Sequence, residues 1–363
     1  MTKKNRLIIL FVCALFFLVI TSSIVLYSLG YRIDFEQKKI TATGGIYLKV
    51  WPQPAEFFVD SKNSGKTKIF SDSIFIQNLL PKQHNVLIKK EGYFPYQKIL
   101  DIKEKEVVKL EHIILFKENI TFEILKNEEN SPFKKQDDNN LFFIKDGGLY
   151  KNNLLEKPSL VLKNLAAFRV AENSIIWLGL DGFVYSSDIS GEKSEKISSS
   201  PLKINKNSSY KIETVFQNIF LFENNHALLL SQKTKEFLSF YDPVKKIEIS
   251  PNGQKVVFYN DYEILFSYIW KLQESENPEK IFLNRFSEKI GQCVWLNNDY
   301  IIFTISDRIK ISEIDNKNNL NIITLPEISA FSGQNPEIYF NQQEKKLYAL
   351  FGDKILISEK IAP

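Results

Sequence analysis

A strand–turn–strand pattern that recurs along the second half of the chain limits the fold more than any other feature. Residues 141–150 (LFFIKDGGLY) contain an apolar strand, an Asp-Gly turn and the start of a second strand, and residues 175–185 repeat this order closely. Weaker copies follow at 256–266, 301–311 and 347–357, and 219–230 leaves room for one more. The copies are roughly 34 to 46 residues apart, which is the period of a four-stranded propeller blade. Residues 141–363 are therefore predicted to form a β-propeller of about six or seven blades, with 186–211 as the place for a seventh; a large β-sandwich with long loops is the alternative.

One of these copies carries a specific turn motif. Ser250, Pro251, Asn252 and Gly253 lead into an apolar strand at 255–258. Pro fixes φ, and an Asn-Gly pair readily takes the positive φ that a tight hairpin turn needs. The motif resembles the Ser-Pro-Asp-Gly element of TolB-like and WD40-like propellers, and this resemblance implies the same fold.

The N-terminal pattern predicts a membrane anchor. Basic residues within 1–6 precede an apolar run at 7–29, and a helix of this length would span roughly 34 Å, enough to cross the hydrocarbon core. The residues expected to anchor it in lipid include Leu7, Phe11, Phe16, Phe17, Ile20 and Leu26. We therefore predict a single-pass transmembrane helix.

The alternative for this segment is a cleaved signal peptide. The apolar run is longer than the 7 to 15 residues of a secretory h-region, and no clean small-x-small cleavage site follows it, so an uncleaved signal anchor is favoured. Lys3, Lys4 and Arg6 favour a cytoplasmic N-terminus, although Lys38 and Lys39 weaken the asymmetry. The expected location is the cell membrane, with the bulk of the chain outside the cytoplasm.

Residues 44–116 are predicted to form a small β domain. Ile46, Leu48 and Val50 alternate with Tyr47, Lys49 and Trp51, which is the period-2 pattern of a half-buried strand. Further short apolar segments follow at 57–59, 74–76, 86–88, 99–100 and 107–116. Six strands in about seventy residues is the spacing typical of a β-sandwich.

The same region resembles the PEGA domain. Its motif order of a Pro-containing turn, a strand ending near Asp, a Gly-x-Thr segment, a Leu-Pro turn and a Gly-Tyr pair is present at Pro52, Pro54, Ala55, Asp60, Gly65, Thr67, Pro81, Gly92 and Tyr93. The chain departs from the family pattern at Pro54, Lys68 and Lys82, which puts the turn geometries in doubt. The resemblance implies a β-sandwich usually found outside the cytoplasm, and it implies no catalytic residue. An anchor, a PEGA-like domain, a polar linker at 117–140 and a propeller-like array together resemble membrane proteins of candidate-phyla bacteria.

Gly65, Lys66 and Thr67 look like the end of a phosphate-binding P-loop. That loop would need a glycine at position 60, where Asp60 stands, and no helical pattern follows. We interpret the segment as a turn.

The chain offers no recognisable catalytic or metal-binding motif. His84, His112 and His226 are scattered, and Cys13 and Cys293 lie far apart, so neither a metal site nor a cofactor is expected. The 47 basic and 43 acidic residues are spread along the chain, which argues against a nucleic-acid partner.

Four tryptophans (Trp51, Trp177, Trp270 and Trp295) are the remaining functional hint, because they could line a sugar- or peptide-binding surface or belong to blade cores. The main hypothesis is a membrane-anchored binding or scaffold protein of the cell envelope. Its partner would be another envelope protein or a cell-wall or surface polymer, bound through the propeller and the PEGA-like domain. The alternative is an extracytoplasmic propeller hydrolase acting on glycans or peptides, for which carboxyl groups would have to converge in the propeller.

Overall fold

The computed structural model describes residues 3–68, 70–125, 132–133, 141–152, 157–171, 173–274, 277–326 and 333–363. The chain divides into two compact units. The first comprises Met1–Ile120, Asp315–Pro326 and Lys360–Pro363, and the second comprises Thr121–Ile314 and Glu327–Glu359. The expected domain boundaries remain predictions, and the two units are described separately.

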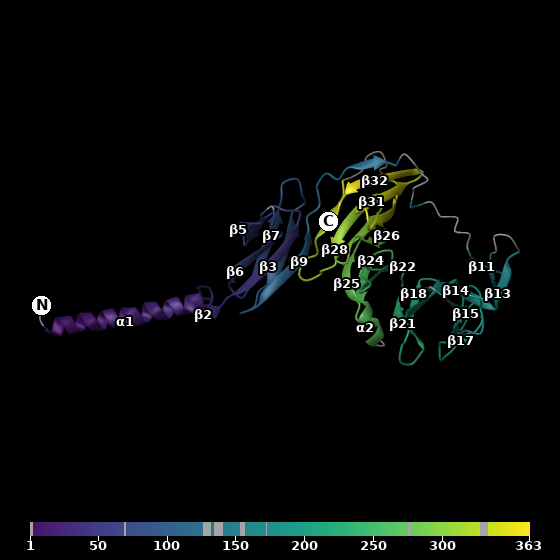
Figure 1. Cartoon of the computed structure of the whole chain (residues 1–363), viewed down its shortest axis with the longest axis horizontal. Coiled ribbons are helices and arrows are strands. Elements are labelled where there is room, and N and C mark those ends of the chain that lie inside the picture. The colour runs from purple at the N-terminus through teal and green to yellow at the C-terminus, as the bar shows by residue number, and fades with distance from the viewer. Residues whose placement is uncertain are drawn as a thin grey trace. The chain divides into compact units, whose positions relative to one another are not determined.

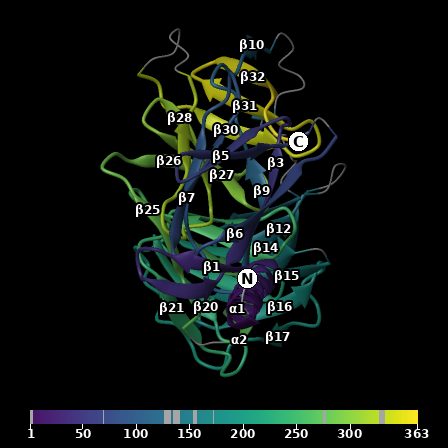
Figure 2. The same cartoon turned by 90° about the vertical axis from the view of Figure 1, so that its left-hand side faces the viewer.

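The N-terminal apolar run forms one straight helix, α1 (Lys3–Ser28), which Figure 2 shows end-on. Its hydropathy is high enough for a membrane span, and none of its residues is buried against the rest of the protein. The six residues expected to contact lipid all lie on this helix with exposed side chains. The helix is therefore a candidate anchor or signal sequence.

A short hairpin and a β-sandwich follow the helix. Strands β1 (Tyr31–Asp34) and β2 (Lys39–Ala42) pair only with each other. The sandwich places one sheet, β6-β3-β9, against a second, β5-β4-β7-β8. The strand bounds are β3 Gly44–Trp51, β4 Glu56–Val59, β5 Lys62–Lys66, β6 Ser73–Leu79, β7 Gln83–Lys89, β8 Tyr96–Asp101 and β9 Val107–Ile114.

The alternation expected for a half-buried strand is present in β3. Ile46, Leu48 and Val50 are fully buried, and they share one core with Phe57 and Ile88 of the second sheet. Burial of apolar side chains from both inner faces is what holds such a sandwich together. All six predicted strands of this region are present.

The interpretation of Gly65-Lys66-Thr67 as a turn is wrong. Gly65 and Lys66 belong to β5, an edge strand that pairs with β4 and contains a bulge. Its sequence, KNSGK, has no apolar residue, so hydrophobic periodicity could not indicate it. Gly65 adopts a φ of +136°, which only glycine takes readily.

Six further sheets of the described residues form a β-propeller (Figure 1), which belongs to the second unit apart from β29 and the last residue of β32. In order they are β11-β12-β13, β14-β15-β16-β17, β18-β19-β20-β21, β22-β23-β24-β25, β26-β27-β28-β29 and β30-β31-β32 with β10. The strands of the first three sheets are β11 Phe142–Lys145, β12 Gly148–Lys151, β13 Ser159–Lys163, β14 Leu165–Ala171, β15 Ser174–Gly179, β16 Val184–Asp188, β17 Glu195–Lys196, β18 Tyr210–Val215, β19 Asn218–Glu223, β20 His226–Leu230 and β21 Phe237–Tyr241. Those of the last three are β22 Lys246–Ile249, β23 Lys255–Tyr259, β24 Glu263–Tyr268, β25 Ile281–Arg285, β26 Ile290–Trp295, β27 Tyr300–Ile305, β28 Arg308–Glu313, β29 Ile322–Thr324, β30 Glu337–Asn341, β31 Lys346–Phe351 and β32 Lys354–Lys360, while the short helix α2 (Ile269–Glu274) follows β24.

Each predicted repeat is one hairpin of one sheet. The six copies correspond to β11–β12, β15–β16, β19–β20, β23–β24, β27–β28 and β31–β32. The stretch 186–211 holds β17 and the start of β18, and no seventh sheet lies in it.

Neighbouring sheets contact each other in the way that the blades of a propeller do. First strands contact first strands at β14 and β18, at β22 and β26, and at β26 and β30, as required when blades converge on a common axis. Apolar clusters fill the spaces between sheets; one of them joins Phe220 and Phe240 of the third described sheet to Phe258 of the fourth.

The last sheet takes its outer strand from an earlier part of the chain. β10 (Phe122–Ile124) pairs antiparallel with β32, so a strand lies within the segment expected to be a linker at 117–140. Residues 126–131 and 134–140 of that segment lie outside the described residues.

Candidate functional site

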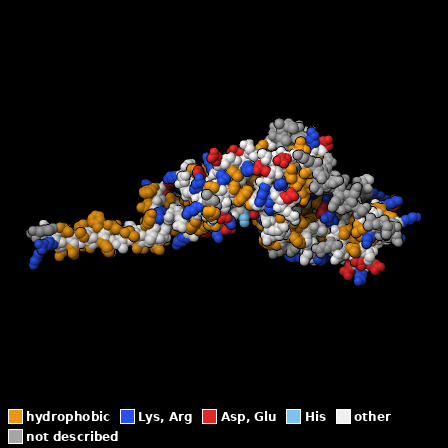
Figure 3. Space-filling view, turned by 45° about the horizontal axis from the view of Figure 1, so that its top comes forward, with side chains coloured by type: hydrophobic (Ala, Val, Ile, Leu, Met, Phe, Trp, Pro, Cys, Tyr) orange, Lys and Arg blue, Asp and Glu red, His pale blue; other side chains and the backbone are white. Residues whose placement is uncertain are grey.

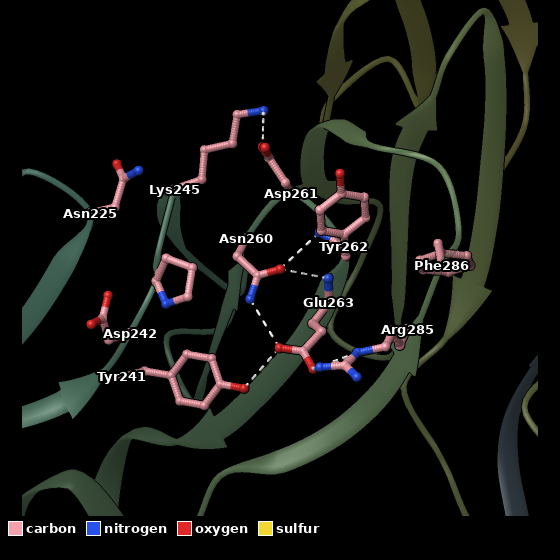
Figure 4. Close-up of a pocket in the computed structure, with 11 residues that line it drawn as sticks. Asn225, Tyr241, Asp242, Lys245, Asn260, Asp261, Tyr262, Glu263, Arg285 and Phe286 are labelled. Carbon is pink, nitrogen blue, oxygen red and sulfur yellow. Dashed lines mark hydrogen bonds and ion pairs between the residues drawn. The ribbon is translucent and has the colours of Figure 1, made fainter.

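Strand direction determines which loops of the propeller gather at one end. Because successive strands of a blade are antiparallel, the turn between its second and third strands lies at the same end as the connection to the next blade. At this end, turns of the third and fourth described sheets surround an open pocket of about 830 Å³ (Figure 4). Its lining comes from residues 225, 241–243, 245, 260–263 and 285–286.

The turn between β23 and β24 is shaped by Asn260. The Asn260 Oδ1 atom accepts hydrogen bonds from the backbone N–H groups of Tyr262 and Glu263, each at 2.8 Å. Asn side chains commonly close turns in this way. The Asn260 amide also donates to Glu263 Oε2 at 3.0 Å, which orients that carboxylate.

Glu263 lies at the centre of a polar network. Tyr241 donates its hydroxyl to Glu263 Oε2 at 3.0 Å, and Arg285 approaches Glu263 Oε1 at 2.9 Å through Nε and at 2.6 Å through a terminal nitrogen. Burial acts to raise the pKa of Glu263, but the hydrogen bonds from Asn260, Tyr241 and Arg285 outweigh it, so the pKa is lowered. Glu263 is therefore a charged hydrogen-bond acceptor. The pKa of Tyr241 is raised, mainly by burial and also by its hydrogen bond to Glu263.

Asp261 is held by two lysines. Lys289 approaches one of its carboxylate oxygens at 3.1 Å and Lys245 the other at 3.4 Å. The hydrogen bond from Lys289 is the main cause that lowers the pKa of Asp261, and the two cations outweigh the opposing effect of burial. Lys245 also donates to the carbonyl of Ile290 at 2.9 Å, which connects this pocket wall to β26.

The charges of the pocket are balanced. Asp242, Asp261 and Glu263 are matched by Lys245 and Arg285 of the lining and by Lys289 beside it. Asp242 also lies 3.3 Å from His226 Nδ1. The ring of Tyr262 is 42% exposed at this pocket, and Asn225 and Phe286 complete the lining. Such a surface offers hydrogen-bonding groups and an aromatic face without a surplus charge.

Two of these carboxylates, Asp261 and Glu263, differ from the acid of a glycoside hydrolase. A glycosidase needs one carboxylic acid with a raised pKa to protonate the leaving group. The pKa values of Asp261 and Glu263 are both lowered, because cations and hydrogen-bond donors surround each of them.

The predicted propeller motif lies in the turn between β22 and β23, which joins first and second strands and therefore belongs to the end opposite the pocket. Ser250 Oγ accepts the backbone N–H of Lys255 at 2.9 Å, and Gly253 takes a φ of +70°. Asn252 does not share this positive φ; its side chain instead accepts the Gln254 N–H at 3.1 Å. Pro251 lies between Ser250 and Asn252. The motif therefore forms a structural turn.

The PEGA-like motif residues occupy turns and close contacts of the sandwich. Thr67 Oγ1 accepts the Ala55 N–H at 2.9 Å, and Asp60 accepts the Asn85 N–H at 3.0 Å. His84, which is buried, lies 2.7 Å from Asp60. The other motif positions are in bends at Pro52, Pro54 and Pro81, in β5 at Gly65, and at Gly92 (φ +77°) and Tyr93, which forms an isolated bridge with Lys117.

The four tryptophans do not form one binding surface. Trp295 is buried and donates to the Glu248 carbonyl at 3.0 Å, while the partly buried Trp177 stacks on Tyr185 at 4.5 Å. Trp51 ends β3, and Trp270 is exposed on α2. The pocket lining contains none of them. Among the described residues, no group of three or more His, Cys, Asp or Glu side chains is placed to hold a metal ion.

No protein-family model matches the chain, and no curated protein matches it. Among solved structures, YCF48 from Cyanidioschyzon merolae is similar with a TM-score of 0.44 and 11% identity, covering 76% of this chain and 91% of that one. YCF48 bound to D1 peptide is similar at a TM-score of 0.39 and 11% identity, covering 61% and 74%. The extracellular domain of a putative hybrid two-component system from B. thetaiotaomicron is similar at 0.40 and 12% identity, covering 60% and 30%. The propeller fold itself rests on the sheet order and first-strand contacts described above.

Proposed function

We propose that this chain is a membrane-anchored, extracytoplasmic binding protein whose propeller pocket binds a neutral carbohydrate segment of a cell-envelope polymer. The observation that carries the proposal is the pocket at β21–β25, in which Asp261 and Glu263 each have a cationic neighbour and Tyr262 is 42% exposed.

The balance of charge favours a neutral ligand. A charged ligand would have to displace Lys289 from Asp261 or Arg285 from Glu263, and so would lose as well as gain an ion pair. Sugar hydroxyls can instead accept from the exposed side of Arg285 and donate to Asp242 without breaking these pairs.

The size and the aromatic ring also favour a carbohydrate. A volume of about 830 Å³ lies within the range of small-ligand pockets and suits two or three sugar units. The half-exposed face of Tyr262 provides an apolar surface for the C–H groups of a sugar ring.

The proposed location follows from the N-terminal part of the chain. The basic residues Lys3, Lys4 and Arg6, which lie at the start of α1 before its apolar run, favour a cytoplasmic N-terminus and an external remainder. The PEGA-like motif order in residues 44–116 supports a sandwich of the kind usually found outside the cytoplasm, with the propeller on the same chain.

The test uses the full chain in lipid nanodiscs, immobilised and exposed to two separate fractions of bacterial envelope, purified polysaccharide and solubilised protein. We expect retention of intact polysaccharide. Tyr262→Ala should weaken retention by about fivefold, since stacking contributes roughly 1 kcal/mol. Tyr339→Ala is the matched control, because Tyr339 is similarly exposed (44%) but lies on β30, away from the pocket lining.

Three outcomes oppose the proposal in different ways. Retention of a protein alone would reject the carbohydrate ligand. Release of shortened polysaccharide would reject a purely binding role and restore the hydrolase alternative. Equal losses in the Tyr262 and Tyr339 variants would reject the pocket as the site.

A further inference from the structure

The hairpin β1–β2 exposes an apolar face directly after the helix α1. Ile33 and Ile40 lie opposite each other in its register, so their side chains share one face. They are 56% and 59% exposed, and Phe35 in the turn is 82% exposed. Three large apolar side chains exposed together on a two-stranded hairpin are costly in water and indicate an interaction surface.

The other face of the hairpin faces protein. Asp34 and Thr41 are buried; Asp34 accepts the backbone N–H groups of Glu36 and Gln37 and so closes the turn. Thr41 donates its hydroxyl to Glu104 at 2.5 Å. Near the turn, at Ile33 and Ile40, the apolar face is therefore left exposed, whereas Ala42 further along the same face is buried.

Only two residues, Leu29 and Gly30, separate α1 from β1, and they do not form a free linker. The Gly30 carbonyl accepts both the N–H and the hydroxyl of Thr43, at 2.9 and 2.7 Å. Arg32 donates to the Tyr27 carbonyl at 2.8 Å, and its guanidinium lies 3.6 Å above the centre of the Tyr27 ring. These contacts attach the hairpin to the last turn of the helix.

We propose that the β1–β2 hairpin lies in the membrane interface and inserts Ile33, Phe35 and Ile40 among the lipids around the end of α1. This inference rests on the proposed function, because it takes α1 as an inserted anchor.

A lipid surface fits the chemistry of the hairpin better than another protein does. Lys38 is exposed in the same turn as Phe35, and a lysine next to inserted apolar side chains is attracted to anionic headgroups. Lys39 is also exposed, on the face opposite Ile40. Figure 3 shows hydrophobic side chains along α1 and again at the hairpin that follows it, so the apolar surface continues beyond the helix.

The experiment places a tryptophan probe at the hairpin of the full chain in vesicles of phosphatidylcholine and phosphatidylglycerol. The probes are Phe35→Trp in the hairpin, Phe17→Trp in the middle of α1, and Phe216→Trp as an exposed control in the second unit, each read against the parent chain. Lipids brominated near the headgroup quench shallow tryptophans, and lipids brominated near the chain ends quench deep ones. We expect Phe35→Trp to be blue-shifted and quenched by the shallow bromines, Phe17→Trp to be quenched by the deep ones, and Phe216→Trp to be quenched by neither.

The possible failures are distinct. Quenching of Phe17→Trp without quenching of Phe35→Trp would overturn the hairpin proposal and leave the anchor intact. Absence of quenching at both positions would overturn the anchor and the hairpin together. A blue shift of Phe35→Trp without quenching would mean that protein, not lipid, covers the hairpin, which also overturns the proposal.

Discussion

Gly147 and Gly182 occupy equivalent hairpin turns in neighbouring sheets but differ in what surrounds them. Both take positive φ, +71° and +87° respectively, where a side chain is strained. A Cβ atom at Gly147 would meet nothing within 4 Å, whereas one at Gly182 would lie 2.0 Å from the carbonyl oxygen of Leu202. That carbonyl is backbone, so it cannot move aside as a side chain would.

These two turns give a matched pair of variants. Gly147→Ala should cost about 1 kcal/mol from backbone strain alone. Gly182→Ala should cost roughly 1 to 3 kcal/mol more, because the Leu202 backbone must shift. Thermal unfolding of the full chain in detergent, followed through the propeller transition, measures the difference; equal shifts for both variants would contradict the close approach seen at Gly182.

The sequence predicted these turns but not the difference between them. An Asp-Gly pair between two apolar segments indicates a hairpin turn wherever it occurs. The contact between Gly182 and Leu202 depends on how a segment twenty residues away folds back, and no local pattern records that. Asp60 is a similar case: its motif position indicated a strand end, whereas its approach to the buried His84 comes from tertiary packing.

At the scale of elements, the strands that the sequence analysis missed are edge strands. β5 and β10 each pair with one neighbour only, and neither has the alternating apolar residues of a strand buried on one face. Hydrophobic periodicity reports burial, so a strand held mainly by backbone hydrogen bonds escapes it. The hairpins of the six predicted repeats, β11–β12 to β31–β32, could be predicted for the opposite reason, because their strands are the most buried of each sheet.

The strand β10 tests how much such backbone bonding contributes. The Leu125 N–H donates to the Ile355 carbonyl at 2.8 Å, whereas Ile124, paired with Leu356, directs its N–H away from β32 because antiparallel bonding alternates. Leu125→Pro should therefore destabilise the last sheet by about 1 kcal/mol, and Ile124→Pro should cost markedly less.

Hydrogen exchange of the β32 amides is the direct measurement for this pair. Faster exchange in Leu125→Pro than in Ile124→Pro is the expected result, because only the first substitution removes a bond of the ladder. Similar exchange rates in both variants would mean that β10 contributes little to the sheet.

For the whole molecule, the sequence predicted the class of fold but not the pocket. The turn of each of the six predicted hairpins contains an Asp or Asn: Asp146, Asp181, Asn224, Asp261, Asp307 and Asp353. This repetition was the available indication that one end of the propeller is polar. It could not show that Tyr241, Glu263 and Arg285 meet, because these residues come from the ends of three strands in two sheets and are brought together only when the blades pack.

The orientation of the chain in the membrane is the remaining property at this scale, and it depends on the charges that flank α1. Lys3, Lys4 and Arg6 lie at the start of the helix, before its apolar run, and Arg32, Lys38 and Lys39 follow the helix within about ten residues. Positive charges are retained on the cytoplasmic side, and Lys3, Lys4 and Arg6 lie directly against the apolar run, whereas Lys38 and Lys39 lie about ten residues beyond it. The parent chain should therefore expose its C-terminal part outside, where protease added to intact spheroplasts digests it.

Replacing Lys3, Lys4 and Arg6 by Gln should increase the protected fraction, because the charges after the helix would then be the larger cluster. Replacing Arg32, Lys38 and Lys39 by Gln is the matched control and should leave digestion complete. Protection of the parent chain would place the propeller in the cytoplasm and would contradict the extracytoplasmic binding role, whatever the pocket binds.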